Sequence, residues 1–176
     1  VFPTTRVGWL SGTDGAIFKT IDEGESWRRQ ESRIPFTDHV RFAVRDIDFY
    51  DTKRGVAVAD GGHITQTSDG GITWTLRKSG FQTPMTGVGF VSEREVWACG
   101  WYGVLLHSDD GGETWERQPY GFGGDDHALW INPNDSEHMI LGYDHGMGVT
   151  YDAGENWYHP DFQSLAQFYA IGLDNS

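Results

Sequence analysis

One eight-residue pattern occurs four times along this 176-residue chain, at nearly constant intervals. Each copy reads Ser/Thr-x-Asp-x-Gly-x-x-Trp, and successive Asp residues lie 47, 41 and 42 residues apart. The shared positions are Asp22, Gly24 and Trp27, then Asp69, Gly71 and Trp74, then Asp110, Gly112 and Trp115, and finally Asp152, Gly154 and Trp157. Such a repeat predicts a fold in which similar small units stand side by side.

The repeated residue types are those of a tight turn between two strands. Ser, Thr and Asp side chains bind nearby backbone N–H groups. Glycine permits a positive φ at the turn, and the Trp ring can fold back over the turn and bury a large apolar area. We therefore interpret the shared positions as structural, and not as catalytic residues.

Short alternating segments surround every copy of the pattern. Three sets recur at the same intervals: residues 46–49, 87–90, 128–131 and 170–173; residues 7–10, 55–59, 95–99 and 138–141; and residues 16–20, 63–67, 104–108 and 147–150. With the strand that begins at each Trp, they give roughly four strands per unit of about 42 residues, the size of a β-propeller blade. No long segment with helical periodicity competes with this interpretation.

We predict an all-β fold, a β-propeller of four-stranded antiparallel blades, with four blades' worth of strands in one domain that spans residues 1–176. The expected blade units are residues 1–30 together with 166–175, 40–78, 84–118 and 125–160. The last strand, residues 168–173, would then complete the first blade and remove two free sheet edges. The ring closes either within a monomer or by joining two chains into a larger ring.

Composition excludes several classes of protein. The 26 Asp and Glu exceed the 13 Lys and Arg and give a net charge of −13, which argues against a nucleic-acid partner. No apolar run approaches the 18 or so residues of a membrane span. Cys99 is the single cysteine, so neither an internal disulfide nor a Cys-based zinc site is possible. We predict no cofactor and no metal site. Because the chain begins at Val1 without Met or a leader, we expect a processed form or a fragment.

The four octapeptides resemble the Asp-box (BNR) repeat of sialidases, sortilin-type receptors, xyloglucan-active glycosidases and the photosystem II assembly factor. Residues 7–118 look most like the photosystem II assembly-factor type, and residues 125–175 are more similar to the sortilin and BNR glycosyl-hydrolase-like group. The segments that carry the resemblance, besides the octapeptides, are residues 7–15, 126–133, 139–142 and 167–170. The resemblance implies a propeller and favours a secreted or periplasmic location. It implies no single activity, because it spans enzymes, receptors and assembly factors.

An enzyme of the sialidase type is disfavoured by the sequence. The tripeptide at residues 33–35 matches a sialidase motif, but it follows an Asp box, whereas in sialidases it precedes the first one. A glycosidase would need two carboxylates across a cleft, and Asp46, Asp48 and Asp126 are candidates at the starts of inner strands. The alternative interpretation is that Asp46 and Asp48, which share one side of a strand, bind backbone groups or neighbouring arginines.

A binding function is the better prediction. Trp101 and Tyr102 occupy a turn that usually carries small polar residues, and exposed aromatic residues suit a protein or a carbohydrate ligand. The candidate binding residues are Trp101, Tyr102, His127, Asp144, His145 and Tyr169. We therefore predict a non-catalytic recognition or scaffold propeller that presents an acidic, aromatic loop face to a protein or carbohydrate, with a glycosidase-like enzyme as the alternative.

Overall fold

The computed structural model describes residues 1–35, 39, 41–119 and 124–160, and these form four antiparallel sheets that follow one another along the chain. We call the sheets the first to fourth blades. The first contains β1 (Gly8–Ser11), β2 (Ile17–Thr20) and β3 (Arg28–Gln30), and the second contains β4 (Val44–Phe49), β5 (Gly55–Ala59), β6 (His63–Thr67) and β7 (Thr75–Lys78). The third contains β8 (Met85–Phe90), β9 (Val96–Gly100), β10 (Val104–Ser108) and β11 (Glu116–Arg117), and the fourth β12 (Asp126–Ile131), β13 (Met139–Tyr143) and β14 (Gly146–Thr150).

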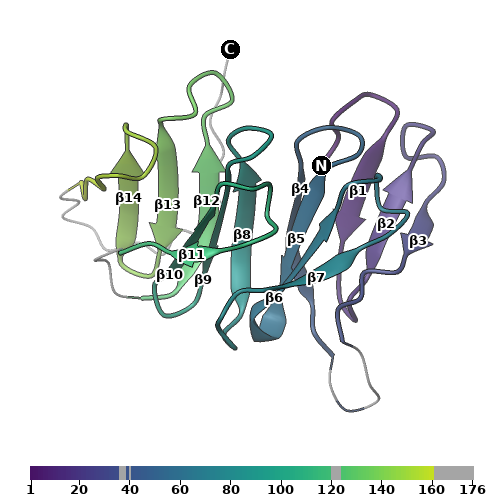
Figure 1. Ribbon diagram of the computed structural model, residues 1–176, viewed down its shortest axis with the longest axis horizontal. Coiled ribbons are helices and arrows are strands. Elements are labelled where there is room, and N and C mark those ends of the chain that lie inside the picture. Colours follow the sequence, from purple (N-terminus) through teal and green to yellow (C-terminus); the bar gives the residue numbers. More distant parts are fainter. Residues whose placement is uncertain (36–38, 40, 120–123, 161–176) are drawn as a thin grey trace.

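The blades stand side by side in an arc, with the first and fourth at opposite ends of the long axis (Figure 1). The predicted all-β propeller architecture is confirmed, and in the described ranges the sole helical element is a 3-10 turn at Asp60–Gly62. No helix in those ranges has the length and apolar character needed to cross a membrane. The strand expected at residues 168–173, and with it Tyr169, lies outside the described residues.

The two inner blades have four strands each, whereas the end blades have three among the described residues. In the fourth blade the outermost strand is reduced to a single bridge between Val149 and Tyr158. The innermost strands of the last three blades, β4, β8 and β12, are neighbours in space. We call the face of a blade on the side of the preceding blade its trailing face. We call the face on the side of the following blade its leading face.

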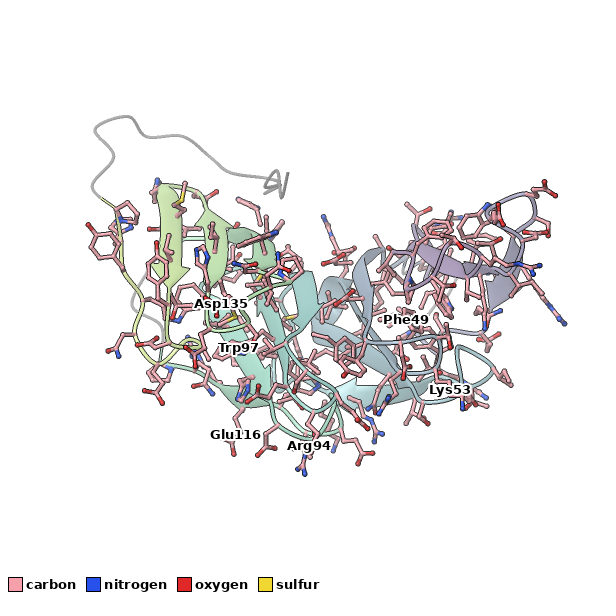
Figure 2. The ribbon with its side chains drawn as sticks, turned by 90° about the horizontal axis from the view of Figure 1, so that it is seen from above. Phe49, Lys53, Arg94, Trp97, Glu116 and Asp135 are labelled. Carbon is pink, nitrogen blue, oxygen red and sulfur yellow. The ribbon has the colours of Figure 1, made fainter. Side chains whose placement is uncertain are left out.

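Three apolar clusters fill the spaces between neighbouring blades. The first joins blades one and two and includes Trp9, Phe49 and Trp74. The second joins blades two and three. The third joins blades three and four around Trp97 and Leu141. Phe49 and Trp97 are labelled in Figure 2, where they mark the first and third clusters. The core is therefore built from blade contacts and not from a single central cluster.

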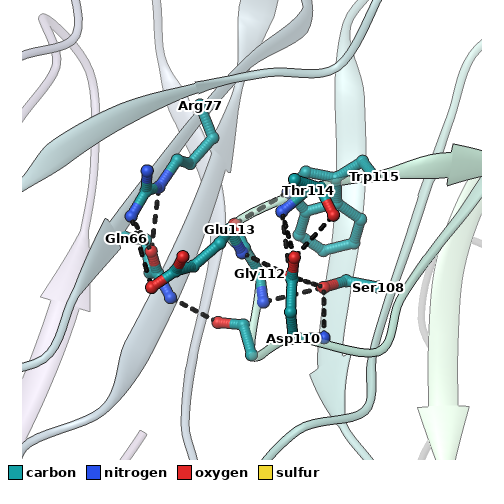
Figure 3. Close-up of polar contacts among 9 residues, drawn as sticks. Gln66, Arg77, Ser108, Asp110, Gly112, Glu113, Thr114 and Trp115 are labelled. Carbon is teal, nitrogen blue, oxygen red and sulfur yellow. Dashed lines mark hydrogen bonds and ion pairs between the residues drawn. The ribbon is translucent and has the colours of Figure 1, made fainter.

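The repeated octapeptide forms a closed network of hydrogen bonds, shown for the third blade in Figure 3. The Ser108 hydroxyl donates to Asp110 Oδ1 at 2.8 Å and accepts the Gly112 N–H at 2.8 Å. Asp110 accepts both the N–H and the hydroxyl of Thr114, at 2.8 and 2.5 Å. Trp115 Nε1 donates to the Gly112 carbonyl at 3.1 Å. Thr20, Thr67 and Thr150 take the hydroxyl position in the other blades.

The glycine of the octapeptide has a second role that the repeat alone did not predict. Gly112 has a φ of +90°, and a Cβ there would lie 2.8 Å from Val56 Cγ2 of the preceding blade. At Gly154 a Cβ would lie 2.6 Å from the Trp97 ring, and at Gly71 it would lie 2.8 Å from Gln30 Oε1 and 3.2 Å from Trp9 Nε1. Each of these glycines therefore permits both the turn and the close approach of two blades.

Side chains of one blade also reach the octapeptide of the next. Lys19 Nζ donates to the Gly70 carbonyl at 2.8 Å, and Gln66 Nε2 donates to the Gly111 carbonyl at 2.6 Å. Arg77 holds the Gln66 side chain from the same blade at 2.7 Å (Figure 3). The octapeptide is thus a joint between blades as well as a turn within one blade.

Candidate binding face

The candidate site lies on one rim of the arc, which we call the entry rim. It is formed by the turns β1–β2, β5–β6, β9–β10 and β13–β14 and by the residues that lead into β4, β8 and β12. Backbone bonds join the two parts: the Asp60 N–H donates to the Ala43 carbonyl at 3.0 Å, and the Trp101 N–H donates to the Pro84 carbonyl at 3.0 Å. The rim is therefore a set of short turns held on the starts of the inner strands.

The Trp101–Tyr102 turn departs from its equivalents in one respect. Tyr102 and Gly103 both have a φ of +62°, and the matching turns of the first two blades have Asp14 and Gly15, and Gly61 and Gly62, at positive φ. A bulky residue is disfavoured in this left-handed region. The Tyr102 side chain is nevertheless 70% exposed, so burial does not offset the strain. Trp101 is half-buried and meets the Tyr102 ring edge-on at a centroid distance of 6.5 Å.

Three of the predicted binding residues are joined by hydrogen bonds through Asp125. The Tyr102 N–H donates to Asp125 Oδ1 at 3.0 Å, and the Asp125 N–H donates to Asp144 Oδ2 at 3.1 Å. Asp144 Oδ1 lies 2.7 Å from His127 Nε2. This hydrogen bond, with that from Asp125, lowers the pKa of the Asp144 carboxyl below its usual value. The exposed His145 follows in the same turn.

Charge is distributed unevenly along the entry rim. Over the first two blades, arginines pair with turn carboxylates: Arg41 with Asp14 at 3.3 Å and Arg45 with Asp60 at 2.7 Å. Toward the fourth blade the rim carries the Asp125, Asp144 and His127 group described above. The acidic character predicted for the loop face is thus concentrated beside Tyr102.

One polar contact beside the rim was not predicted. The hydroxyl of Tyr143, at the end of β13, lies 2.5 Å from His159 Nδ1. Burial raises the pKa of this tyrosine, because its charged form is poorly solvated there. The sequence gives no signal for this pair, since the two residues belong to different turns of the blade.

Two of the three carboxylates of the enzyme alternative, Asp46 and Asp48, bind backbone groups of the next blade. Asp46 Oδ2 accepts the Val88 N–H at 2.9 Å, and Asp48 Oδ2 accepts the Phe90 N–H at 2.9 Å, so both bind the edge of the next inner strand. Burial raises the pKa of Asp46 to about 6 and also raises that of Asp48. Asp126 is buried at the start of β12. Of the two interpretations of Asp46 and Asp48, backbone binding is the one observed.

A cavity of about 420 Å³ opens between the ends of β4, β8 and β12, on the rim opposite to the entry rim. Asp48 lines it, together with aromatic residues such as Tyr50, Phe90 and Trp130. Of the described residues in its walls, Asp48 alone carries a carboxylate. The pair of facing carboxylates that a glycosidase needs is therefore not assembled there by the described part of the chain.

In the described ranges, no group of three or more His, Cys, Asp and Glu side chains is placed to hold a metal ion. Cys99 is fully buried in β9, and burial raises the pKa of its thiol. Such a thiol is a packing group and not a nucleophile.

Comparison with protein families gives a match that covers most of the chain. The model of the family "Photosynthesis system II assembly factor YCF48" matches residues 37–160. The photosystem II assembly lipoprotein Ycf48 of Synechococcus sp. (strain CC9902) is 33% identical over 76 residues, which are 41% of this chain and 22% of that protein. The chloroplastic photosystem II stability/assembly factor HCF136 of Oryza sativa subsp. japonica is 30% identical over 101 residues, 53% of this chain and 24% of that protein.

Solved structures share the fold at low sequence identity. A structure described as YCF48 bound to D1 peptide superposes with a TM-score of 0.70 at 18% identity, over 93% of this chain and 53% of that one. An ancestral GH74 enzyme superposes with a TM-score of 0.73 at 12% identity, over 92% and 23%. The chain spans less than a quarter of the length of the two curated relatives above. The names of these two relatives are those of photosystem II assembly factors.

Proposed function

Because this chain belongs to the photosynthesis system II assembly factor YCF48 family, we propose that it is a non-catalytic propeller module that binds a segment of a photosystem II subunit at its entry rim. The names of the relatives support assembly as the process, and the structure titled YCF48 bound to D1 peptide supports a peptide as the ligand. Binding would then involve an extended segment that runs across several short turns.

The conformation and exposure of Tyr102 are the observation that supports binding at the entry rim. Its backbone is held at a φ of +62° while its ring stays in solvent, so the turn accepts strain and gains no burial in return. Residues held in such sparsely populated backbone regions cluster at ligand-binding and active sites. Aromatic residues dominate binding energy at protein interfaces, and Asp125 and Asp144 beside Tyr102 would attract a cationic group of the peptide.

The test measures binding of synthetic peptides that tile the D1 protein, by fluorescence anisotropy with the full chain. We expect Tyr102→Ala to weaken the tightest peptide at least roughly tenfold, as for an interface aromatic residue. Tyr50→Ala is the matched control, because Tyr50 is an exposed tyrosine on the opposite rim. A tightest peptide that binds Tyr102→Ala as well as the parent would refute the site.

Tyr102→Gly separates binding from folding. Glycine adopts the positive φ without strain, so this variant should melt at the same or a higher temperature than the parent and still lose the peptide. A chain that binds xyloglucan oligosaccharides and no D1 peptide would contradict the proposal in favour of a carbohydrate ligand. Turnover of a chromogenic glycoside that Asp46→Asn abolishes would instead favour the enzyme.

A further inference from the structure

A cavity of about 490 Å³ lies between the first blade and the octapeptide of the second. One wall comes from β2, β3 and the turn that joins them, and the other from residues 70–72. These walls belong to two consecutive blades, so the cavity does not depend on where the chain begins or ends. The turns of the entry rim contribute no described residue to the walls. The cavity is therefore separate from the site proposed above.

Two indole N–H groups are buried beside this cavity without an acceptor. Trp9 and Trp74 are 0% and 3% exposed, and in the described part of the chain neither Nε1 atom has a hydrogen-bond partner. Both nitrogens lie 3.2 Å from the position that a Cβ of residue 71 would occupy, and Gln30 Oε1 lies 2.8 Å from it. Gly71 and Gln30 both line the cavity. Two unused donors and one amide group therefore converge at its wall.

The second octapeptide differs here from two of the others. Trp27 Nε1 donates to the Gly24 carbonyl and Trp115 Nε1 to the Gly112 carbonyl, each at 3.1 Å. Trp74 makes no such bond to any described residue. A buried donor without an acceptor weakens a fold, and such donors are rare in native proteins. The contact between the first two blades thus leaves a place for an acceptor group from outside.

The side chains around the cavity favour an anion. The register places Trp9, Lys19 and Arg28 in one row across β1, β2 and β3, on the face that packs against the second blade. Arg28 is exposed, and no carboxylate of a described residue forms an ion pair with it. Burial lowers the pKa of the Lys19 ammonium, which lies 4.9 Å from the centre of the Trp9 ring. The described lining contains three cationic side chains and one carboxylate, that of Glu31. This cavity is therefore locally cationic in a chain of net charge −13.

We propose that the cavity binds the side-chain carboxylate of an acidic peptide segment. The indole N–H groups of Trp9 and Trp74 donate to the carboxylate, and the two cations of the row balance its charge. A carboxylate fits this arrangement because its two oxygens accept about four hydrogen bonds. Hydrogen bonds to a charged acceptor are also stronger than those to a neutral one. The proposal does not depend on ligand binding at the entry rim.

The apolar residues of the cavity indicate what flanks the acid in the ligand. Ile21 stands on the first-blade wall and Ile72 on the second-blade wall, 64% and 79% exposed. Exposed aliphatic side chains on both walls suit apolar residues on both sides of the acid. The ligand is thus a segment that continues past its acidic residue, with the pattern apolar-acidic-apolar, and not a chain terminus.

Titration of the ¹⁵N-labelled full chain with acetyl-Leu-Asp-Leu-amide, followed by NMR of the indole N–H signals, tests the proposal. Each of the eight tryptophans gives one signal, and Trp9→Phe and Trp74→Phe identify the two donors by the signals they remove. We expect both signals to move downfield as the bonds form. The Trp115 signal should stay in place, because that N–H already has an acceptor. Acetyl-Leu-Asn-Leu-amide, the uncharged match, should bind roughly tenfold more weakly.

Substitutions at the exposed edge of the cavity test the charge without disturbing the core. Arg28→Gln should weaken binding of the Asp peptide about two- to fivefold and reduce its dependence on salt, as for a partly screened ion pair. Lys78→Gln is the matched control, since Lys78 is an exposed cation at the end of β7 and lines a different cavity. Trp74→Phe keeps an aromatic ring but lacks the N–H, so it should weaken binding roughly tenfold.

Three results would overturn the proposal. Indole signals that stay in place at millimolar peptide would mean that water alone meets the two N–H groups. Equal affinity for the Asp and Asn peptides would remove the role of the charge. Tighter binding of acetyl-Leu-Ala-Leu, which ends in a free carboxylate, would show a site for chain termini instead. Tyr102→Ala should bind the Asp peptide as the parent does, so a failure here is distinguishable from a failure of the entry rim.

Discussion

The first and second blades carry the same octapeptide, yet their tryptophans lie in different surroundings. Trp27 is 36% exposed and Trp74 is 3% exposed. The carboxylate bonds of the two turns are alike, since Asp22 Oδ1 accepts the Thr20 hydroxyl at 2.6 Å and Asp69 Oδ1 accepts that of Thr67 at 2.9 Å. The indoles differ: Trp27 Nε1 donates to the Gly24 carbonyl at 3.1 Å, whereas Trp74 Nε1 is buried without a hydrogen-bond partner among the described residues. The difference is the neighbour: Trp74 packs on the leading face of another blade. The turn is therefore a local structure, whereas burial of its tryptophan depends on the preceding blade.

The largest expected difference between the two blades is the loss of stability when the tryptophan side chain is removed. Trp74→Ala should lower the free energy of unfolding by about 3–5 kcal/mol, the usual cost of emptying a buried aromatic site. Trp27→Ala should cost about 1 kcal/mol or less, as for a surface residue. Urea denaturation of both variants measures the difference. Equal losses would mean that the first blade is covered as fully as the second.

Asp46 and Asp48 of the second blade accept backbone N–H groups of the third blade. Titration of these carboxylates should therefore make the stability of the contact between the two blades depend on pH. Burial raises the pKa of Asp46 to about 6, above its value of about 3.9 in an unfolded chain. The folded state therefore binds this proton more tightly, so the stability contributed by protonated Asp46 is present below pH 4 or so and declines as the pH rises to about 6. The decline should total about 3 kcal/mol.

Asp46→Asn should remove that decline while keeping an acceptor for the Val88 N–H, and urea midpoints at several pH values would reveal it. The octapeptide carboxyls act in the opposite sense, because hydrogen bonds from Ser26 and Thr20 lower the pKa of Asp22 to about 2. Their contribution is lost as the pH falls toward that value. A variant profile parallel to that of the parent would contradict the assignment of the slope to Asp46.

Substitution of the octapeptide glycines should distinguish their role in the turn from their role in the contact between blades. Gly24→Ala meets strain from its φ of +93° but finds space, since the nearest neighbour is its own Trp27 ring at 3.7 Å. Gly112→Ala meets similar strain and also the Val56 methyl at 2.8 Å. We expect Gly112→Ala to cost about 1–3 kcal/mol more than Gly24→Ala, the typical penalty of overpacking. Thermal melts of the two variants would decide it, and the same loss in both would remove the packing role.

The smallest expected difference concerns the aspartates. Asp22→Ala and Asp69→Ala each remove hydrogen bonds that are confined to one turn, and each should lower the stability of the fold slightly. The two losses should agree, because these bonds do not involve the preceding blade. Chemical denaturation of the pair tests this equality. A clearly larger loss for Asp69→Ala would show that the turn and the joint are coupled.

The fold was predictable because its determinants are close in sequence. The bonds of the octapeptide join residues two to four positions apart, such as Thr67 to Asp69 and Gly71. The alternating strands are likewise local patterns. The joints were not predictable, because Gln66 binds a carbonyl 45 residues away and Asp46 an N–H 42 residues away. No local pattern marks such partners.

The candidate site was predictable in part for the same reason. Trp101 and Tyr102 stood out because they break a turn pattern, and this is a local signal. Asp125, which joins Tyr102 to Asp144, lies 23 residues beyond the turn, and no local pattern pairs it with Tyr102. Tyr143 and His159 form their contact across 16 residues. The sequence thus indicated Tyr102, Asp144 and His127 as single residues, and did not indicate the contacts that join them.

The dependence of each tryptophan on the preceding blade sets an order for synthesis. A chain leaves the ribosome at about 5–20 residues per second, so one blade follows another within seconds. During that interval Trp9, Val56 or Trp97 stands bare on the newest blade, because the glycine turn that covers it has not yet been made. The nascent chain therefore always exposes one apolar face, and that face moves forward with translation. Chaperone contact and aggregation should concentrate on the most recently synthesised blade, whichever blade that is at a given moment.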